Sequence, residues 1–183
     1  MHVIWYTAMS MDGRIADTHD SLHFLESIGE ADGDGDDFTA FLNTVDAVIV
    51  GASTLRWLLR GGHGWPHGDL PTWLVSHDES LVAAAAGGPV PLRRLEGSLD
   101  VAFAEMEDAG HRRVWLCGGG SVAGQALALD RVDEVVVTVA PVALGAGPAL
   151  FDAAGLPLRR FQLVECRAIG GDAARLRWVR DRR

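Results

Sequence analysis

The alternation of short apolar runs with segments of helical periodicity limits the folds open to this chain more than any other feature. Runs rich in Val, Ile and Trp are typical of strands that are buried on both faces. Several segments between them open with Ser or Asp, which cap helix amino termini. The strand-like runs are residues 3–8, 47–51, 72–76, 114–117 and 134–139, and the helical segments are residues 36–43, 53–59, 98–109 and 121–129. This order predicts an α/β fold in which helices cover both faces of a mainly parallel sheet.

The pattern changes after Pro141. Residues 161–167 and 174–180 are two strand-like runs, and the residues between them include Gly170 and Gly171. This combination predicts an antiparallel hairpin at the carboxyl-terminal edge of the sheet. The 183 residues contain no internal repeat and are enough for one domain over residues 1–183. Two further stretches are interpreted as surface loops, residues 61–68 and 83–88.

Charge and composition exclude several classes of function. A net charge of −9 opposes general binding to nucleic acids or anionic membranes, because these attract dense Lys and Arg surfaces. All 16 basic residues are Arg, which excludes Schiff-base chemistry on Lys. The two cysteines suggest no disulfide framework, and the sequence has neither a signal-peptide pattern nor an apolar run long enough to cross a bilayer. We therefore expect a cytoplasmic protein whose partner is a small molecule.

A glycine-rich turn is the first candidate for a functional site. Gly118, Gly119 and Gly120 follow an apolar run and precede a helical segment that opens with Ser121. Glycines let backbone N–H groups approach an anion, and the helix presents its positive end to it. A tight turn without a ligand is the alternative interpretation. The spacing from Gly118 to Ala123 also fits the Rossmann fingerprint, although the motif lies late in the chain and no acid follows about twenty residues on.

A second turn of the same kind lies at Gly51, where an apolar run ends and a helical segment with Ser53 and Thr54 begins. These hydroxyls cap the helix, either alone or together with a bound phosphate. Two glycine-to-helix turns in one parallel sheet favour a nucleotide with a pyrophosphate bridge. A third motif, Asp12-Gly13, follows the first apolar run, and turn chemistry alone accounts for it.

Taken in order, these motifs resemble the reductase domain of bacterial bifunctional riboflavin deaminase-reductases and their stand-alone relatives. The resemblance covers about residues 1–180, through the segments 9–16, 50–54, 116–121, 132–134 and 140–151. It implies a dihydrofolate-reductase-like fold with three layers, α/β/α, bound NADPH and a homodimer. It also implies hydride transfer to a C=N or C=O group of a small pteridine-, pyrimidine- or sugar-like substrate, linked to riboflavin or folate metabolism.

The resemblance also assigns roles to individual residues. Ala8 and Ile15 would flank the nicotinamide, and Ser76 and His77 would border the adenosine ribose. The phosphates would meet the two helix starts, at Gly51, Ala52, Ser53, Thr54, Gly118, Gly119, Gly120, Ser121 and Val122. The substrate would lie against Asp12, Gly13, Arg14 and the apolar Trp57. We expect Asp12 to be the catalytic acid, with Glu26, Asp36 and Asp37 as alternatives.

The chain departs from the family pattern at several positions. Ala52 stands where many relatives have Arg, and His77 stands where they have a basic residue. The favoured cationic partners of a 2′-phosphate are thus missing at position 52 and weaker at position 77. Arg56, Arg93 and Arg94 could replace them, and we expect only a modest preference for NADPH. Cys117 replaces the usual Glu, and the sequence lacks both the deaminase zinc signature and the Pro-Trp motif of folate reductases.

Two other functions remain open, a nucleotide-binding sensor without catalysis and a Rossmann-type NAD oxidoreductase. We expect no bound metal. Residues 30–35 begin like a calcium loop, but Phe41 stands where the loop needs a bidentate Glu. His63 and His67 are separated by helix-breaking residues and have no apparent third ligand.

Overall fold

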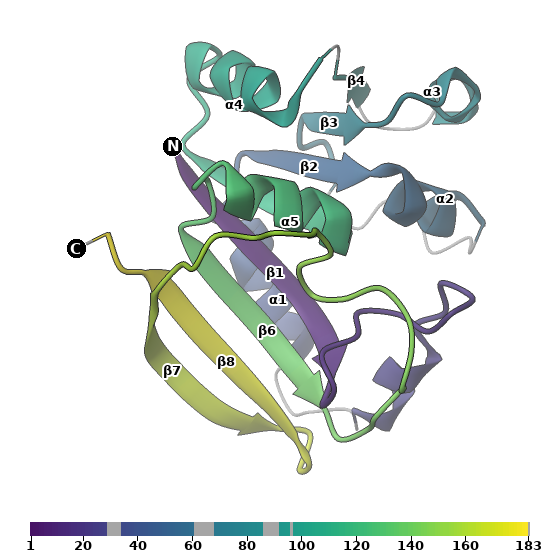
Figure 1. The fold of residues 1–183 in the computed structure, drawn as a ribbon, viewed down its shortest axis with the longest axis vertical. Helices are drawn as coiled ribbons and strands as arrows, with labels where there is room; N and C mark the ends of the chain where they lie inside the picture. Colours follow the sequence, from purple (N-terminus) through teal and green to yellow (C-terminus); the bar gives the residue numbers. More distant parts are fainter. Residues whose placement is uncertain (29–33, 61–67, 86–91, 96, 183) are drawn as a thin grey trace.

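The computed structural model describes residues 1–28, 34–60, 68–85, 92–95 and 97–182. The strands form one sheet in the order β4-β3-β2-β5-β1-β6-β8-β7 (Figure 1). Their bounds are β1 His2–Ser10, β2 Ala47–Gly51, β3 Thr72–Val75, β4 Leu92–Arg94, β5 Arg113–Gly118, β6 Glu134–Ala140, β7 Phe161–Ile169 and β8 Ala173–Arg180. The helices are α1 Asp34–Leu42, α2 Ala52–Arg60, α3 Glu79–Ala85, α4 Leu99–Asp108 and α5 Gly120–Ala128, with a short 3-10 helix, η1, at His23–Ser27. No helix in these residues is long and apolar enough to span a bilayer.

The strand directions agree with the prediction from the sequence. All pairs among the first six strands, β1–β6, are parallel. β8 runs antiparallel to β6, and β7 runs antiparallel to β8. The hairpin turn between β7 and β8 places Gly170 and Gly171 at positive φ angles of 57° and 90°, which favour glycine. The fold is therefore the predicted α/β fold, parallel at its centre and antiparallel at its carboxyl-terminal edge.

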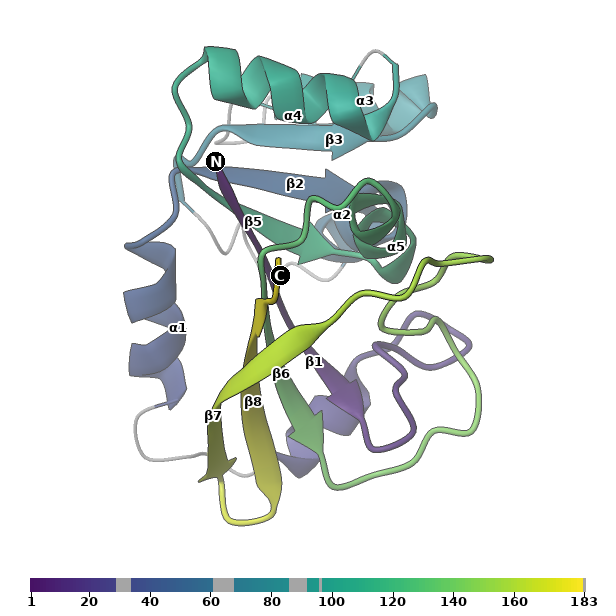
Figure 2. The same cartoon turned by 60° about the vertical axis from the view of Figure 1, so that its left-hand side comes forward.

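Helices cover both faces of the sheet (Figure 2). The largest core cluster contains Trp5 and Ile49 from the sheet and buried residues of α4 and α5. On the other face, Val48 belongs to a cluster with residues of α1, and Val50 to a cluster with residues of α2 and α3. Because successive residues of β2 face opposite layers, its unbroken apolar sequence is explained by burial on both sides.

Besides η1, two elements differ from the sequence prediction. Residues 83–85, interpreted as part of a surface loop, form the end of α3, while residues 86–88 and the predicted loop 61–67 lie outside the described residues. The Oδ1 atom of Asp78 caps α3 by accepting hydrogen bonds from the N–H groups of Ser80 and Leu81. The three-residue strand β4 was not predicted, because it is too short for a periodic pattern and is defined by its pairing with β3.

Glu134 is a buried carboxylate in β6, with only 5% of its surface exposed. It accepts a hydrogen bond of 2.6 Å from Arg177 Nε and lies 2.9 Å from His2 Nε2. Burial alone raises the pKa of this carboxyl, but the hydrogen bonds with His2 and Arg177 outweigh it and lower the pKa to about 2. The ionised form therefore stabilises the junction between β1, β6 and β8.

We expect Glu134→Gln to lower the free energy of unfolding at pH 7 by about 2–3 kcal/mol, because it leaves a partly buried Arg177 without its charged partner. A lowered pKa in the folded state stabilises the protein above the ordinary value near 4.5, and this contribution is lost as the pH falls toward 2. Urea denaturation should thus show a clear difference between the variant and the wild type at pH 7 and almost none near pH 2. The control is Glu165→Gln, at a more exposed ion pair, which should cost less than about 1 kcal/mol.

Candidate functional site

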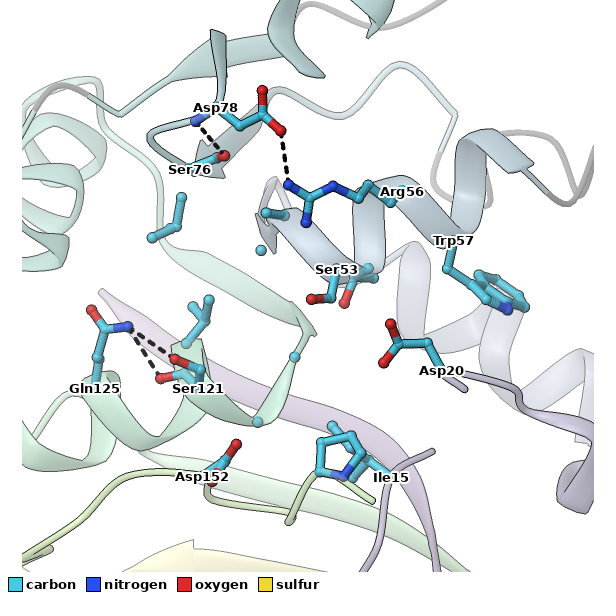
Figure 3. Close-up of a pocket in the computed structure, with 18 of the residues that line it drawn as sticks. Ile15, Asp20, Ser53, Arg56, Trp57, Ser76, Asp78, Ser121, Gln125 and Asp152 are labelled. Atoms are coloured by element: carbon cyan, nitrogen blue, oxygen red, sulfur yellow. Dashed lines mark hydrogen bonds and ion pairs between the residues drawn. The ribbon is translucent and has the colours of Figure 1, made fainter. Parts of the chain in front are cut away.

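A cavity of about 840 Å³ opens at the carboxyl ends of the parallel strands β2, β3 and β5 (Figure 3). This is the edge of an open α/β sheet at which ligands bind. The size is within the range of sites for small molecules and cofactors. The cavity has three parts, which are the starts of α2 and α5, the end of β3 with the segment before α4, and the segment that follows β1.

The middle part consists of two helix starts. α2 begins at Ala52 directly after β2, and α5 begins at Gly120, after the N-cap residue Gly119. Gly119 has no side chain to cap α5, so the first N–H groups of the helix remain for another partner. The dipoles of two helices that start at one cavity favour an anion there. The predicted phosphate-binding residues that line the cavity are Gly51, Ala52, Ser53, Thr54, Gly119, Gly120, Ser121 and Val122.

The three glycines of the turn differ in what an added Cβ atom would contact. Gly118 has a φ angle of +152°, and a Cβ atom there would lie 2.6 Å from Thr54 Oγ1. At Gly120 a Cβ atom would lie 2.0 Å from the carbonyl oxygen of Ala149. At Gly119 the nearest atoms would be Thr54 Oγ1 at 3.6 Å and Ile15 Cδ1 at 3.9 Å, which are ordinary contacts. The packing of the protein therefore leaves room for a side chain at Gly119, and that room belongs to the cavity.

The second part of the cavity lies at the end of β3. Val75, Leu95 and Leu99 give it an apolar wall, and Ser76 and His77, both predicted to border a ribose, line it. Arg56 of α2 forms an ion pair with Asp78, with 2.8 Å between Nη2 and Oδ2 (Figure 3). Ser76 Oγ accepts a hydrogen bond of 3.0 Å from the Asp78 N–H. An apolar wall with a polar rim of this kind suits a base and its sugar.

The third part contains the predicted Ile15 and Trp57 together with Asp20, which sequence reasoning missed. Asp20 has a φ angle of 59°, and Figure 3 shows its carboxylate directed into the cavity between Ser53 and Trp57. Asp152 and Gln125 also line the cavity and were not predicted. Sequence patterns give no signal for these residues, because they lie in irregular loops or on an ordinary helix face.

Five predicted residues are not among the described residues that line the cavity, namely Ala8, Asp12, Gly13, Arg14 and Gly118. The carboxylate of Asp12 accepts hydrogen bonds from Ser10 Oγ at 2.5 Å and from the N–H groups of Leu144 and Gly145 at 3.0 and 2.7 Å. These bonds, above all that from Ser10, lower the pKa of Asp12 to about 2. Asp12 is therefore ionised near neutral pH and fastens the loop that follows β6, and its role as the catalytic acid stays a prediction.

The neighbouring Arg14 also holds the segment that follows β6 and does not line the cavity. Its Nη1 donates a hydrogen bond of 3.0 Å to the carbonyl oxygen of Gly147. Of the alternative acids, Glu26 forms an exposed contact with His23, and Asp37 pairs with Arg175. The side chain of Asp36 lies outside the described residues. Neither Glu26 nor Asp37 lines the cavity.

Cys117, which stands where relatives have Glu, carries an unreactive thiol. Burial raises the pKa of the Cys117 thiol to about 12, so it does not form a thiolate near neutral pH. Across the described ranges no three His, Cys, Asp or Glu side chains come together as a metal site. His63, His67 and most of the segment 30–35 lie outside those ranges.

The sheet order, the two helical layers and the cavity define this protein as an α/β protein of the dihydrofolate-reductase-like fold. The family model of the RibD C-terminal domain matches residues 1–174, and the chain belongs to this family. The resemblance found in the sequence is thereby confirmed. The curated relative YwjB, an uncharacterized protein of Bacillus subtilis (strain 168), is 29% identical over 155 residues, which cover 81% of each chain.

Solved structures agree with the family assignment. A Shewanella sp. PV-4 protein, provisionally described as a riboflavin biosynthesis protein, is 26% identical with a TM-score of 0.87, and both chains are covered completely. A pyrimidine reductase-like protein of Corynebacterium diphtheriae shares 18% identity at a TM-score of 0.73, over 100% of this chain and 92% of that one. The Thermotoga maritima deaminase/5-amino-6-(5-phosphoribosylamino)uracil reductase shares 16% identity at a TM-score of 0.74. This chain is covered to 98% by that match and the Thermotoga chain to 56%.

Proposed function

We propose that this protein is an NADPH-dependent reductase that transfers hydride to a C=N or C=O group of a small heterocyclic or sugar-like substrate. Membership in the RibD C-terminal family supports the reaction class. The observation that carries the proposal is the turn at Gly119, where the protein leaves room beside two helix starts. A nucleotide pyrophosphate needs both this room and the N–H groups around it.

The residues present fit this cofactor. The starts of α2 and α5 would hold the pyrophosphate, and Ser76, with the apolar wall at the end of β3, would hold the adenosine. The nicotinamide would lie on the side of Ile15. NADPH, when bound, supplies the hydride and so the difficult step of the reaction.

The chain's own residues would align the substrate and keep water away. Ile15, Leu22 and Trp57 form an apolar surface in the third part of the cavity, which suits a planar ring. Asp20 is the carboxylate of this part, and we propose that it replaces Asp12 as the group that orients the substrate or holds its proton. Asp12 and Arg14 would act indirectly, by fixing the loops on which the cavity rests.

The residues that line this third part disfavour the binding of a phosphorylated substrate. The described residues that line it are Ile15, Ala16, Asp20, Leu22, Trp57 and Pro148, an apolar set with one acid and no cation. A substrate phosphate would lack a charged partner there and would be repelled by Asp20. We therefore expect poor turnover of the phosphoribosyl aminopyrimidine of riboflavin biosynthesis. The chain also lacks the Pro-Trp motif of folate reductases, and we expect dihydrofolate to be a poor substrate as well.

Steady-state oxidation of NADPH, followed by absorbance, checks this substrate prediction. We expect kcat/KM below about 10⁴ M⁻¹s⁻¹ for both compounds, which is the lower end of ordinary enzymatic values. Unphosphorylated pteridines, aminopyrimidines and small sugars with a carbonyl or imine group should give higher kcat/KM values. A higher value for either named compound would contradict the prediction.

The proposed function itself is tested by titration of the purified protein with NADPH, with nucleotide fluorescence as the readout. Saturable binding followed by oxidation in a panel of carbonyl and imine compounds supports a reductase. Binding without oxidation of any member of the panel favours the alternative of a nucleotide sensor. The homodimer and the cytoplasmic location stay predictions, and light scattering of the purified protein checks the first.

A further inference from the structure

The Arg56–Asp78 ion pair lies at the end of the cavity that would hold the adenosine. Both side chains line the cavity, and both are partly exposed there, Arg56 to 40% and Asp78 to 36%. Among the described lining residues Arg56 is the only arginine. The other arginines considered from the sequence are engaged elsewhere, since Arg93 lies over the Trp73 ring and Arg94 pairs with Glu79. Among the described lining residues, Arg56 is thus the permanently charged cation available to a phosphate on the adenosine ribose, and the imidazole of His77 is a further lining group.

Asp78 is held in place independently of Arg56. Its Oδ1 atom accepts hydrogen bonds from the N–H groups of Ser80 and Leu81 and from Ser80 Oγ at 2.6 Å, and so caps α3. Its Oδ2 atom faces Arg56 at 2.8 Å. The hydrogen bond from Ser80 and the contact with Arg56 lower the pKa of Asp78 to about 2, so the carboxylate is ionised near neutral pH. A ligand phosphate at Arg56 would therefore meet a fixed negative charge.

We propose that Asp78 sets the cofactor preference of this protein by competing with the 2′-phosphate of NADPH for Arg56. Arg56 attracts the 2′-phosphate, and the carboxylate of Asp78 opposes it while it can accept a hydrogen bond from the 2′-hydroxyl of NADH. The two residues together leave the protein with a weak preference between the two nucleotides. This inference rests on the proposed binding of a nicotinamide dinucleotide.

Asp78→Asn is the decisive variant, because Asn caps helices as well as Asp does and keeps the shape of the side chain. It removes the charge and leaves α3 intact. The dissociation constants of NADPH and NADH are measured by fluorescence titration, and the readout is their ratio, which a purely structural change would leave constant. We expect the wild type to prefer NADPH by less than about a thousandfold. Asp78→Asn should increase this preference about tenfold or more, the effect of one charge-assisted hydrogen bond.

The reciprocal variant is Arg56→Gln, which should lower NADPH affinity about tenfold or more and change NADH affinity less than about threefold. Two controls remove similar charges outside the cavity, Asp108→Asn at the exposed end of α4 and Arg60→Gln on the same helix as Arg56. Both should keep the ratio within about twofold of the wild type.

The results separate this inference from the proposed function. If the wild type binds both nucleotides and Asp78→Asn leaves their ratio unchanged, the inference is wrong and the proposed function stands. If Arg56→Gln weakens both nucleotides equally, Arg56 does not contact the 2′-phosphate and the inference is again wrong. If neither nucleotide binds to the wild type at millimolar concentration, both proposals fail.

Discussion

Replacement of Gly119 by Val should lower the affinity for NADPH at least about a hundredfold, or about 2.7 kcal/mol, in a protein that still folds. A Cβ atom at this position meets only ordinary contacts, and the φ angle of −101° is one that Val adopts readily. The side chain would fill the space beside the start of α5 that the pyrophosphate needs. Fluorescence titration measures the affinity, and circular dichroism with thermal unfolding confirms the fold.

Gly119 is the N-cap of α5, and Val is a poorer cap, so the variant should lose no more than about 1 kcal/mol of stability. The control is Ala128→Val at the exposed end of the same helix, which creates the same side chain outside the cavity and should leave binding unchanged. Unaltered NADPH affinity in a folded Gly119→Val protein would show that the phosphates lie elsewhere.

The next residue should behave in the opposite way. Gly120→Ala brings a Cβ atom to 2.0 Å from the backbone oxygen of Ala149, a distance that the structure can relieve only by moving the loop before β7. The Asp152 N–H, which donates a hydrogen bond of 3.0 Å to the Gly120 carbonyl, would move with it. We expect a loss of about 2 kcal/mol or more in the free energy of unfolding, measured by urea denaturation.

Gly119→Ala is the matched comparison, since it adds the same methyl group one residue earlier and should cost no more than about 1 kcal/mol. Equal losses in the two variants would mean that packing, and not a ligand, explains the glycine at position 119. The pair therefore separates the contribution of the turn to the fold from its contribution to binding.

The predicted cavity residues at the two helix starts follow a local rule, whereas Ile15, Trp57, Ser76 and His77 were assigned through the family resemblance. Gly51 and Gly119 stand where a strand passes directly into a helix, and Ser53 and Ser121 lie in the first turn of that helix. A strand, a glycine and a helix start follow one another in the sequence, so the two turns proposed to bind phosphate can be located without coordinates. The same reason explains why the hairpin at Gly170 and Gly171 was predicted correctly.

The residues that were missed, or that were predicted but do not line the cavity, depend on contacts between distant parts of the chain. Asp12 has the residue type and the position of a catalytic acid, yet its carboxylate is held by Leu144 and Gly145, which lie 132 and 133 residues further along the chain. Asp20 looks like any loop residue in the sequence, and only the folded loop directs it into the cavity beside Trp57.

Apart from η1, α3 and β4, the sequence by itself determined the order of strands and helices, the parallel centre and antiparallel edge of the sheet, and the two turns proposed to bind phosphate. These features follow from apolar periodicity, helix caps and glycine positions, which are properties of short segments. Only the tertiary structure decided which side chains share the cavity, that Asp78 caps α3 and pairs with Arg56, and that Gly119 alone of the three adjacent glycines could carry a Cβ atom with ordinary contacts. Direction and distance between side chains depend on how the elements pack, and no local pattern of residues records that packing.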